Sequence, residues 1–357
     1  MLLKSYQKGT PFIGEVFKID RSVFRNQIKQ AHLTSASNYS IVGHNGNLNL
    51  NHVIKSAMGE WIERLSLFYD RYLSQEFIPA VNLINGEIIE VEKGRIIFKE
   101  KEMFNDSCGV ASHLVSKKVI RSSYYEFFER QSLIYNWITE SKGTIIDYSD
   151  INHPIINHLI ETNYKFIDEL YLFDISLHKS IKVVLALGFG ENYKTVGLNA
   201  SFNSKQAIIG ALEESIQTFA PNWTKGYINS FYTSENKRKN FDMYLQLYMD
   251  LTPQEFKRKY NYLINSEEKV KIVNYLEQSQ EFSVNAMKRV ADDLDLHPYC
   301  AFIPSFYDGL STKIIKIFSP NGYPHMHPPF FSEEETSITF NKQNEKFPNA
   351  YMEIPFP

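Results

Sequence analysis

The stretch SKKVIRSSYYEFFERQSLIYNW, residues 116–137, predicts a strong helix. Two carboxylates within it, Glu126 and Glu129, are three residues apart and therefore share a helical face, and Arg130 follows them directly. Outward from this stretch, two more strong helices are predicted at residues 51–70 and 204–220. Because each of the three helices lies among predicted strands rather than in βαβ units, the sequence indicates an α+β fold.

Short β-rich segments account for the predicted strands. The hairpin signals Asn85-Gly86 and Lys93-Gly94 separate the first three of them. In chain order the predicted strands are residues 77–84, 87–91, 95–99, 143–148, 169–176, 181–188 and 312–318. Shorter helices are predicted at residues 154–161, 240–249, 252–260 and 283–294. The expected architecture is therefore antiparallel sheets packed with the helices that carry the carboxylates.

The chain is expected to form a single domain over residues 1–357, because no low-complexity linker or internal repeat divides it. Residues 1–42 are predicted to form an N-terminal strand and helix segment. The polar and aromatic residues 222–281 favour a peripheral insert or lid. Residues 350–357 form a proline-containing tail that ends in IPFP.

Composition excludes several classes of protein. The 38 Lys+Arg against 41 Asp+Glu give a net charge of −3, which argues against a nucleic-acid-coating protein, and 43% hydrophobic residues argue against disorder. The two cysteines, Cys108 and Cys300, offer no disulfide framework and favour the cytoplasm. The N-terminus turns polar too early for a secretory signal, and the longest apolar run, residues 183–189, is too short to span a membrane.

Three further motifs favour structural roles. Residues 188–195 have glycines followed by Lys-Thr, but the spacing differs from a phosphate-binding P-loop and favours a β-turn. His325 and His327 lie among prolines without neighbouring ligands at zinc-like spacing. Cys108 lacks a nucleophile signature and is interpreted as a packed thiol.

The same carboxylate spacing recurs on the other two strong helices. On the first, Ser56, Glu60 and Glu63 share a face opposite the apolar stripe, and on the third, Glu214 and Gln217 take equivalent positions. If the three helices converge, five carboxylates meet in one pocket, where their repulsion would require a counter-charge. Mg²⁺ would provide it and would suit a Mg-nucleotide without a P-loop. Ordinary solvated helix surfaces with paired charges are the alternative interpretation.

Read with their flanking residues, these motifs resemble the YcaO family of ATP-dependent peptide-backbone-modifying enzymes. The first helix motif, with its Ser-Ala-x-x-Glu-x-x-Glu-Arg core, the Asp-Ser-Cys-Gly turn before the second helix, and the Ala-Leu-x-Glu-x-x-Gln ending of the third occur in the family's order. The resemblance extends to a strand and the proline-rich end, and is carried by residues 46–64, 106–113, 125–130, 207–217, 313–318 and 354–357.

The resemblance implies that four glutamates bind Mg²⁺ together with the phosphates of ATP: Glu60, Glu63, Glu126 and Glu129. It implies that the nucleotide site is also lined by Ser56, Arg130, Glu214 and Gln217, and that Glu129 and Arg130 act in catalysis. The carboxylate of the last residue, Pro357, or a group that it positions, is expected to act on the substrate proton.

The sequence departs from the family pattern at three places. His44-Asn45-Gly46 replaces a frequent Gly-Lys-Gly before the first helix, and Leu114 and Lys118 replace an Asn and a Glu before the second. The C-terminal end lacks the fully alternating prolines.

The activity that the resemblance implies is cyclodehydration of Cys, Ser or Thr residues in a ribosomally made precursor peptide, which gives azolines. The side chain attacks the preceding carbonyl, and ATP phosphorylates the amide oxygen so that it leaves as phosphate. Thioamide formation from external sulfide, amidine formation from an internal amine, and a non-catalytic scaffold that binds peptide or partner stay open as alternatives.

Expected partners are the precursor peptide, an E1-like or ThiF-like protein that presents the peptide's leader, a flavin dehydrogenase in the same pathway, and a second copy of the chain in a homodimer. A TfuA-like partner would favour the thioamide. Nucleic acid and membrane are not expected partners.

Overall fold

The computed structural model describes residues 2–4, 15–20, 28–35, 41–69, 71–72, 75–98, 106–218, 243–306, 311–341 and 346–357. Parts of the segments 1–42 and 222–281 therefore lie outside the described residues. Among those described, no helix combines the length and the apolar character that crossing a membrane demands.

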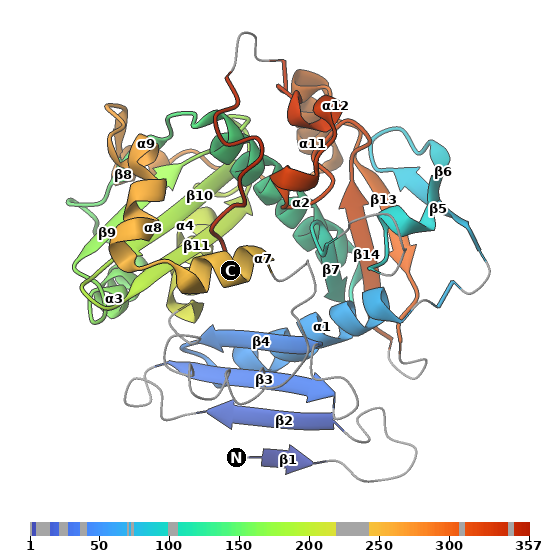
Figure 1. Ribbon diagram of the computed structural model, residues 1–357, viewed down its shortest axis with the longest axis horizontal. Coiled ribbons are helices and arrows are strands. Elements are labelled where there is room, and N and C mark those ends of the chain that lie inside the picture. The colour runs from blue at the N-terminus through green and yellow to red at the C-terminus, as the bar shows by residue number, and fades with distance from the viewer. Residues whose placement is uncertain are drawn as a thin grey trace.

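The described residues form three β-sheets (Figure 1). The N-terminal sheet has the order β1 (Leu2–Lys4), β2 (Glu15–Asp20), β3 (Lys29–Ser35), β4 (Val42–Asn47). The second sheet has the order β11 (Lys194–Ser201), β10 (Lys182–Phe189), β9 (Glu169–Asp174), β8 (Thr144–Asp147), β12 (Lys269–Lys271). The third has the order β6 (Ile88–Glu92), β5 (Phe77–Asn82), β13 (Tyr299–Ile303), β14 (Lys313–Phe318), β7 (Val110–His113). Only β8 and β12 pair in parallel among these strands, so the predicted antiparallel α+β class is confirmed.

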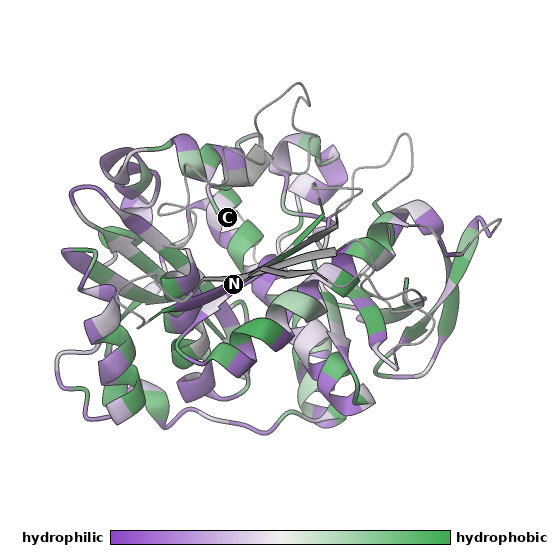
Figure 2. Ribbon diagram, turned by 90° about the horizontal axis from the view of Figure 1, so that it is seen from below, coloured by the Kyte–Doolittle hydropathy of each residue, from purple (hydrophilic) through white to green (hydrophobic). Residues whose placement is uncertain are grey.

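The three strong helices lie where the sequence predicts them, as α1 (Leu50–Phe68), α2 (Ser116–Thr139) and α4 (Ser204–Gln217). The side chains of Asn49 and Asn203 cap the first turns of α1 and α4 by accepting backbone N–H groups there. The other helices are α3 (Pro154–Asn163), α7 (Met243–Asp250), α8 (Pro253–Lys259), α9 (Asn261–Ile264), α10 (Ile272–Leu276), α11 (Val284–Leu294) and α12 (Glu333–Thr336). Hydrophobic and hydrophilic residues alternate along the helices, as amphipathic packing requires (Figure 2).

Strand β10 is buried along its whole length because helices cover both faces of its sheet. Val183, Leu185 and Leu187 belong to the hydrophobic cluster around α2, whereas Val184 and Ala186 belong to the cluster of α3 and α4. This arrangement explains why residues 183–187 form a continuous apolar run without the alternation of a half-exposed strand.

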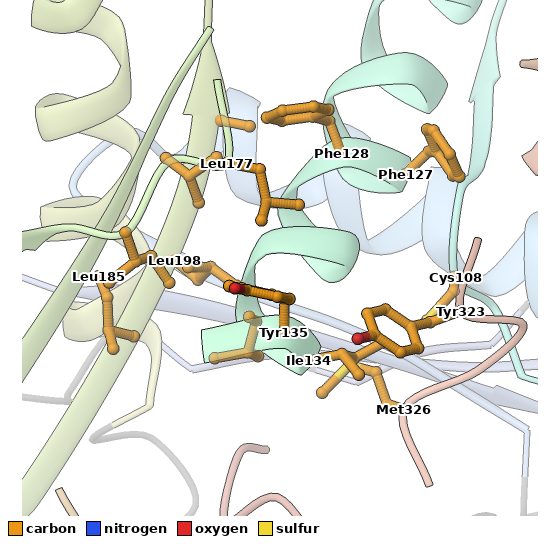
Figure 3. Close-up of a cluster of buried hydrophobic side chains, with 14 of the residues drawn as sticks. Cys108, Phe127, Phe128, Ile134, Tyr135, Leu177, Leu185, Leu198, Tyr323 and Met326 are labelled. Atoms are coloured by element: carbon orange, nitrogen blue, oxygen red, sulfur yellow. The ribbon is translucent and has the colours of Figure 1, made fainter. Parts of the chain in front are cut away.

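Helix α2 lies between the second and third sheets (Figure 1). Leu185 and Leu198 of the second sheet pack near one side of it, while Tyr323 and Met326 of a later loop pack near the other (Figure 3). The other face of the third sheet packs on α1 through a cluster that contains Trp61, Ile62, Leu65, Ile78, Ala80, Ala301, Ile303 and Ile314. Helices α1 and α2 are therefore held by the same sheet.

Two of the predicted segments differ in the structure. Of the predicted strand at residues 95–99, the described residues 95–98 do not form a strand: Lys93–Arg95 is a 3₁₀ turn, and Ile96 and Ile97 are buried in the cluster that contains the core residues of α1. The segment 222–281 is built into the fold wherever the structure describes it. Its β12 joins the second sheet, and Tyr248, Phe256, Tyr260 and Leu263 lie in the α2 cluster.

Candidate functional site

Helix α1 approaches strand β4 closely enough for a glutamate to accept a strand N–H group. A Cβ on Gly43 would lie 2.0 Å from the Ala57 carbonyl oxygen, so only glycine allows this approach. The next residue, His44, donates its backbone N–H to Glu60 Oε2 at 2.6 Å. The other oxygen of Glu60 forms an ion pair with Arg64 at 2.7 Å.

Helix α4 approaches strand β11 in the same way. A Cβ on Gly197 would lie 2.0 Å from the Ala211 carbonyl oxygen, and the following residue, Leu198, donates its N–H to Glu214 Oε2 at 2.7 Å. Two residues further along β11, the N–H of Ala200 donates to Glu129 Oε2 of helix α2 at 3.2 Å. Strand β11 thus holds one carboxylate from each of two helices.

The carboxylates on α1, α2 and α4 lie within electrostatic reach of one another. Glu126 interacts with Glu63 and Glu129, while Glu129 interacts with Glu214, and Glu214 with Glu60. The predicted convergence of the three helices is therefore present in the fold.

Burial is the main cause of a raised pKa at four of these carboxylates. It raises the pKa of Glu63 to about 7, although a hydrogen bond with Ser112 acts in the opposite direction. It raises the pKa of Glu129 to about 8 and that of Glu126 well above its usual value, although Arg130 lowers both. The pKa of Glu214 is also raised. Without a bound cation these carboxyl groups therefore keep their protons more readily near neutral pH, and a cation beside them would favour their ionised form.

Arg130 is the cation that these carboxylates share. Burial acts to lower its pKa, but Glu129 and Glu126 raise the pKa above its ordinary value, so the guanidinium stays charged. Its Nε lies 3.7 Å from Glu129 Oε1, and its carbon Cζ lies 5.0 Å from the centre of the Phe356 ring. Its Nη1 is buried without a hydrogen-bond partner, which leaves a donor available for an anion.

These residues fit a magnesium-bound anion. Among the described residues, no three His, Cys, Asp or Glu side chains form a ready-made metal cage. Mg²⁺ does not need one, since it is usually held by one or two carboxylates, waters and the phosphates of a substrate. Carboxylates with raised pKa values would be stabilised by the cation, and Arg130 Nη1 could donate to a phosphate oxygen.

The remaining predicted site residues lie around this cluster. Gln217, one turn after Glu214 on α4, accepts a hydrogen bond from Asn45 Nδ2 of β4 at 3.0 Å. Ser56 is half-buried, one turn before Glu60 on α1. Pro357 follows Phe356, whose ring covers Arg130. The positions that depart from the family pattern, Leu114 and Lys118, are exposed near the start of α2.

Two charged residues that the sequence analysis did not select adjoin the cluster. Lys316 of β14 is only 1% exposed, interacts with Glu126, and donates to the backbone oxygen of Asp106 at 2.9 Å. Burial acts to raise the pKa of Asp106, but Lys316 helps to hold it below its usual value. The sequence contains a signal for Lys316, which lies inside the apolar strand KIIKIF. A lysine buried in such a strand needs a charged or polar partner.

Two of the motifs that the sequence predicts to be structural, residues 188–195 and Cys108, occupy structural positions. Residues 188–195 form the turn between β10 and β11, closed by Gly190 N donating to Tyr193 O at 2.9 Å. Cys108 is buried, and burial together with the Asp106 carboxylate raises the pKa of its thiol well above the usual value, so it is no thiolate nucleophile.

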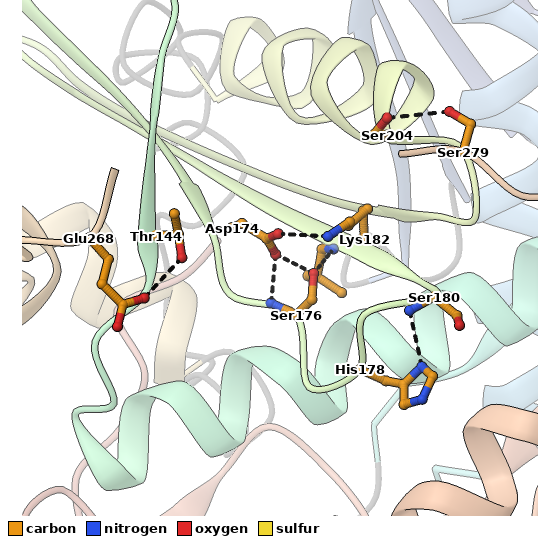
Figure 4. A network of polar contacts seen from close by, with 10 residues as sticks. Thr144, Asp174, Ser176, His178, Ser180, Lys182, Ser204, Glu268 and Ser279 are labelled. Carbon is orange, nitrogen blue, oxygen red and sulfur yellow. Dashed lines mark hydrogen bonds and ion pairs between the residues drawn. The ribbon is translucent and has the colours of Figure 1, made fainter. Parts of the chain in front are cut away.

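A separate polar cavity of about 310 Å³ lies at the end of α2 and the adjoining edges of β8, β9 and β10. Both of its carboxylates accept hydrogen bonds within the protein: Asp174 accepts from Ser176 and from Lys182 at 3.2 Å, and Glu268 accepts from Thr144 at 3.3 Å (Figure 4). None of the predicted site residues lines it. The carboxylate cluster, with its raised pKa values, is therefore the stronger candidate for the functional site.

The fold and the cluster together define an α+β protein suited to a metal-bound anion. Residues 69–296 match the sequence model of the YcaO family, described as a YcaO cyclodehydratase that binds ATP and Mg²⁺. This match covers more than half of the chain, and the chain belongs to the YcaO family. ATP and Mg²⁺ are therefore the cofactors of its family, as predicted. The matched residues include Glu126, Glu129, Arg130, Glu214 and Gln217.

Solved structures have a similar fold. A chain of the E. coli microcin synthetase McbBCD complex is 17% identical, with a TM-score of 0.76 over 100% of both chains. YcaO from Methanopyrus kandleri bound with AMPPCP and Mg²⁺ is 15% identical, with a TM-score of 0.68 over 86% of this chain and 85% of that one. A heterocyclase in complex with substrate and cofactor is 12% identical, with a TM-score of 0.73 over 97% of this chain and 55% of that one. No curated protein sequence matches this chain.

Proposed function

We propose that this chain is an ATP- and Mg²⁺-dependent cyclodehydratase that converts Cys, Ser or Thr residues of a ribosomally made precursor peptide to azolines. The observation that carries the proposal is the group of buried carboxylates with raised pKa values around Arg130, in a member of the YcaO family. Such a group is costly to bury without a cation, so its retention favours an enzyme that uses Mg-ATP.

Each residue of the site has a distinct task in this proposal. Glu60, Glu63, Glu126 and Glu129 hold Mg²⁺, while Arg130 donates to the phosphates. The nucleotide is further lined by Ser56, Glu214 and Gln217. The support is the hydrogen bonding described above: the backbone N–H groups of His44, Leu198 and Ala200 orient Glu60, Glu214 and Glu129. This preorganisation means that little reorientation is needed when charge develops during the reaction.

The chemistry balances with one ATP for each ring. A peptide thiol or hydroxyl loses its proton and attacks the preceding backbone carbonyl carbon. The γ-phosphoryl group of ATP passes to the former amide oxygen with release of ADP, and this oxygen leaves as phosphate. The amide nitrogen loses its proton as the C=N bond of the azoline forms. We assign this proton to the carboxylate of Pro357, the residue after Phe356, whose ring lies over Arg130.

We further propose the partners that the family resemblance implies. They are the precursor peptide, an E1-like or ThiF-like protein that presents its leader, a flavin dehydrogenase in the same pathway, and a homodimer. The similar chain from the McbBCD complex, also solved with pro-MccB17 bound, supports assembly with other proteins and a peptide substrate. Two free cysteines, one of them buried, support a cytoplasmic location. A single catalytic domain is supported by the shared packing of α2 against two sheets.

The deciding experiment is the intact mass of a candidate Cys/Ser/Thr-rich peptide, encoded near this gene, after co-expression with this chain and its partner. We expect the loss of one water per modified residue, and its absence with Glu63→Gln, which keeps the shape of the side chain but removes its charge. Glu90→Gln, at an exposed position on β6, is the matched control and should modify the peptide normally.

Other outcomes of this experiment select the alternatives. Exchange of oxygen for sulfur in the peptide would replace azoline formation with thioamide formation, and cyclisation by an internal amine would indicate an amidine. An unchanged peptide together with no Mg-ATP binding would contradict the enzymatic proposal and favour a scaffold.

A further inference from the structure

The C-terminal tail, residues 346–357, runs alongside helix α2 (Figure 1). Asn349 Nδ2 donates to the carbonyl oxygen of Trp137 at 3.1 Å, and Trp137 Nε1 donates to the carbonyl oxygen of Met352 at 2.9 Å. Two turns earlier on the same helix, the ring of Phe356 covers Arg130. The tail therefore runs from the C-terminal end of α2 back toward the carboxylate cluster.

A second element, the loop GYPHMHP at residues 322–328, is fixed to the helix that carries Arg130. Gln131, the residue after Arg130, bonds the Tyr323 backbone twice: Oε1 accepts from Tyr323 N at 2.7 Å, and Nε2 donates to Tyr323 O at 2.9 Å. The turn before α2 fixes the loop as well, because Met326 N donates to Asp106 Oδ2 at 2.7 Å. These bonds are buried, so they hold the loop in one position relative to Arg130.

A hydrogen-bonded pair of side chains joins the loop to the tail. His327, which is fully buried, places Nδ1 3.0 Å from Glu353 Oε2. Because a carboxylate only accepts hydrogen bonds, Nδ1 carries the proton and donates it. Glu353 directly precedes Ile354, Pro355 and Phe356, which are all buried. This contact therefore lies three residues before the ring that covers Arg130.

We propose that His327 and Glu353 are positioning residues that set the end of the chain against Arg130. Gln131 and Asp106 hold the GYPHMHP loop in place, and the loop holds Glu353 through His327. The buried residues after Glu353 then place the Phe356 ring over the guanidinium, with Pro357 following it. His327 thereby has a role other than metal binding. The inference rests on the proposed function for its effect on turnover, although the anchoring of the tail can be measured without any turnover.

The test compares two variants at one position. Glu353→Leu removes the acceptor at nearly the same volume, whereas Glu353→Gln keeps an oxygen that can accept from His327 Nδ1. Glu334→Leu, at an exposed position on α12, controls for the added leucine. Hydrogen exchange of the tail amides, followed by mass spectrometry, reports on anchoring. The kcat for peptide cyclisation and the Kd for Mg-ATP report on function.

We expect Glu353→Leu to accelerate tail exchange by about tenfold or more, as loss of a charge-assisted hydrogen bond implies. We expect kcat to fall by about tenfold with the Kd for Mg-ATP changed by less than about threefold, and Glu353→Gln to recover most of both losses. A general loss of folding would instead change exchange throughout the protein and would not be rescued by glutamine.

Three results would overturn the inference. Unchanged tail exchange in Glu353→Leu would show that the pair does not anchor the tail. Faster exchange with unchanged kcat would reduce the contact to a structural one, and a lower kcat without faster exchange would place the effect outside the tail. If the wild-type protein modifies no peptide, the proposed function fails, while the exchange comparison still decides whether Glu353 anchors the tail.

Discussion

Helices α1 and α2 carry the same sequence pattern, Glu-x-x-Glu-Arg, but the two arginines have different surroundings. In α1, Arg64 pairs with Glu60 and donates to the Val42 carbonyl oxygen at 2.9 Å, and its side chain is 40% exposed. In α2, the side chain of Arg130 is 16% exposed, and it interacts with Glu126, Glu129 and Glu214 while one of its nitrogens keeps no partner.

The difference shows that one motif can serve two purposes. Arg64 links Val42, the first residue of β4, to α1 and pairs with the partly exposed Glu60. Its role is therefore mainly structural. Arg130 lies where carboxylates from two helices meet and is covered by Phe356, so it can respond to a bound anion. A guanidinium with several donors is well suited to phosphate, whereas an arginine that is already engaged with a carbonyl and a carboxylate is not.

The largest effect should come from exchanging these arginines for lysine. Arg130→Lys keeps the charge but loses the planar set of donors, so we expect kcat/KM for peptide cyclisation to fall by about 10²–10³-fold. Arg64→Lys should lower it by less than about threefold, as expected of an exposed ion pair. Rates from intact-mass kinetics would check both, and equal losses in the two variants would contradict the division of roles.

A smaller effect concerns the close approach of helices to strands. In helix α4, Glu214 is not followed directly by an arginine. It accepts a hydrogen bond from Leu198 N, and this bond requires the close approach of α4 to β11 that Gly197 allows. Gly197→Ala would place a methyl group 2.0 Å from the Ala211 oxygen, and we expect a loss of about 1–3 kcal/mol in the free energy of unfolding.

Gly59→Ala, inside α1, is the control for this prediction. Its Cβ would meet only the Ser112 hydroxyl oxygen, at 3.2 Å, so stability should stay within about 1 kcal/mol of wild type. Denaturant unfolding measures both variants. A Gly197→Ala protein as stable as Gly59→Ala would show that α4 can move away from β11 at little cost.

A further effect is a pH dependence of stability in the metal-free protein. A carboxyl group whose pKa is raised on folding binds its proton more tightly in the folded state, so it destabilises the fold as pH rises through the shifted range. With the pKa of Glu63 at about 7 and that of Glu129 at about 8, the melting temperature should fall between about pH 5 and about pH 8. Glu129→Gln should flatten this fall, and saturating Mg-ATP should reduce it.

Glu353→Gln serves as a comparison in that measurement, since it lies in the tail rather than the cluster. An unchanged slope in Glu129→Gln would mean that this carboxyl titrates near its ordinary value.

The helices were predictable because their signals are local. Apolar residues at three-and-four spacing mark α1, α2 and α4, and the same spacing places the two glutamates of each motif on one face. Several strands were not predicted. Strand β11, KTVGLNAS, has polar residues and glycine that favour turns, and it becomes a strand only because it pairs along its whole length with the apolar β10.

The sequence by itself determined which carboxylates and arginines share a helical face, because these follow from spacing along a helix. The tertiary structure decided which of these carboxylates are buried near one another. The N–H groups of His44, Leu198 and Ala200 come from two strands in different sheets, and Asp106, Lys316 and Phe356 come from segments far apart in the chain. Burial and electrostatic coupling depend on such distances in space, and a motif that repeats in the sequence carries no information about them.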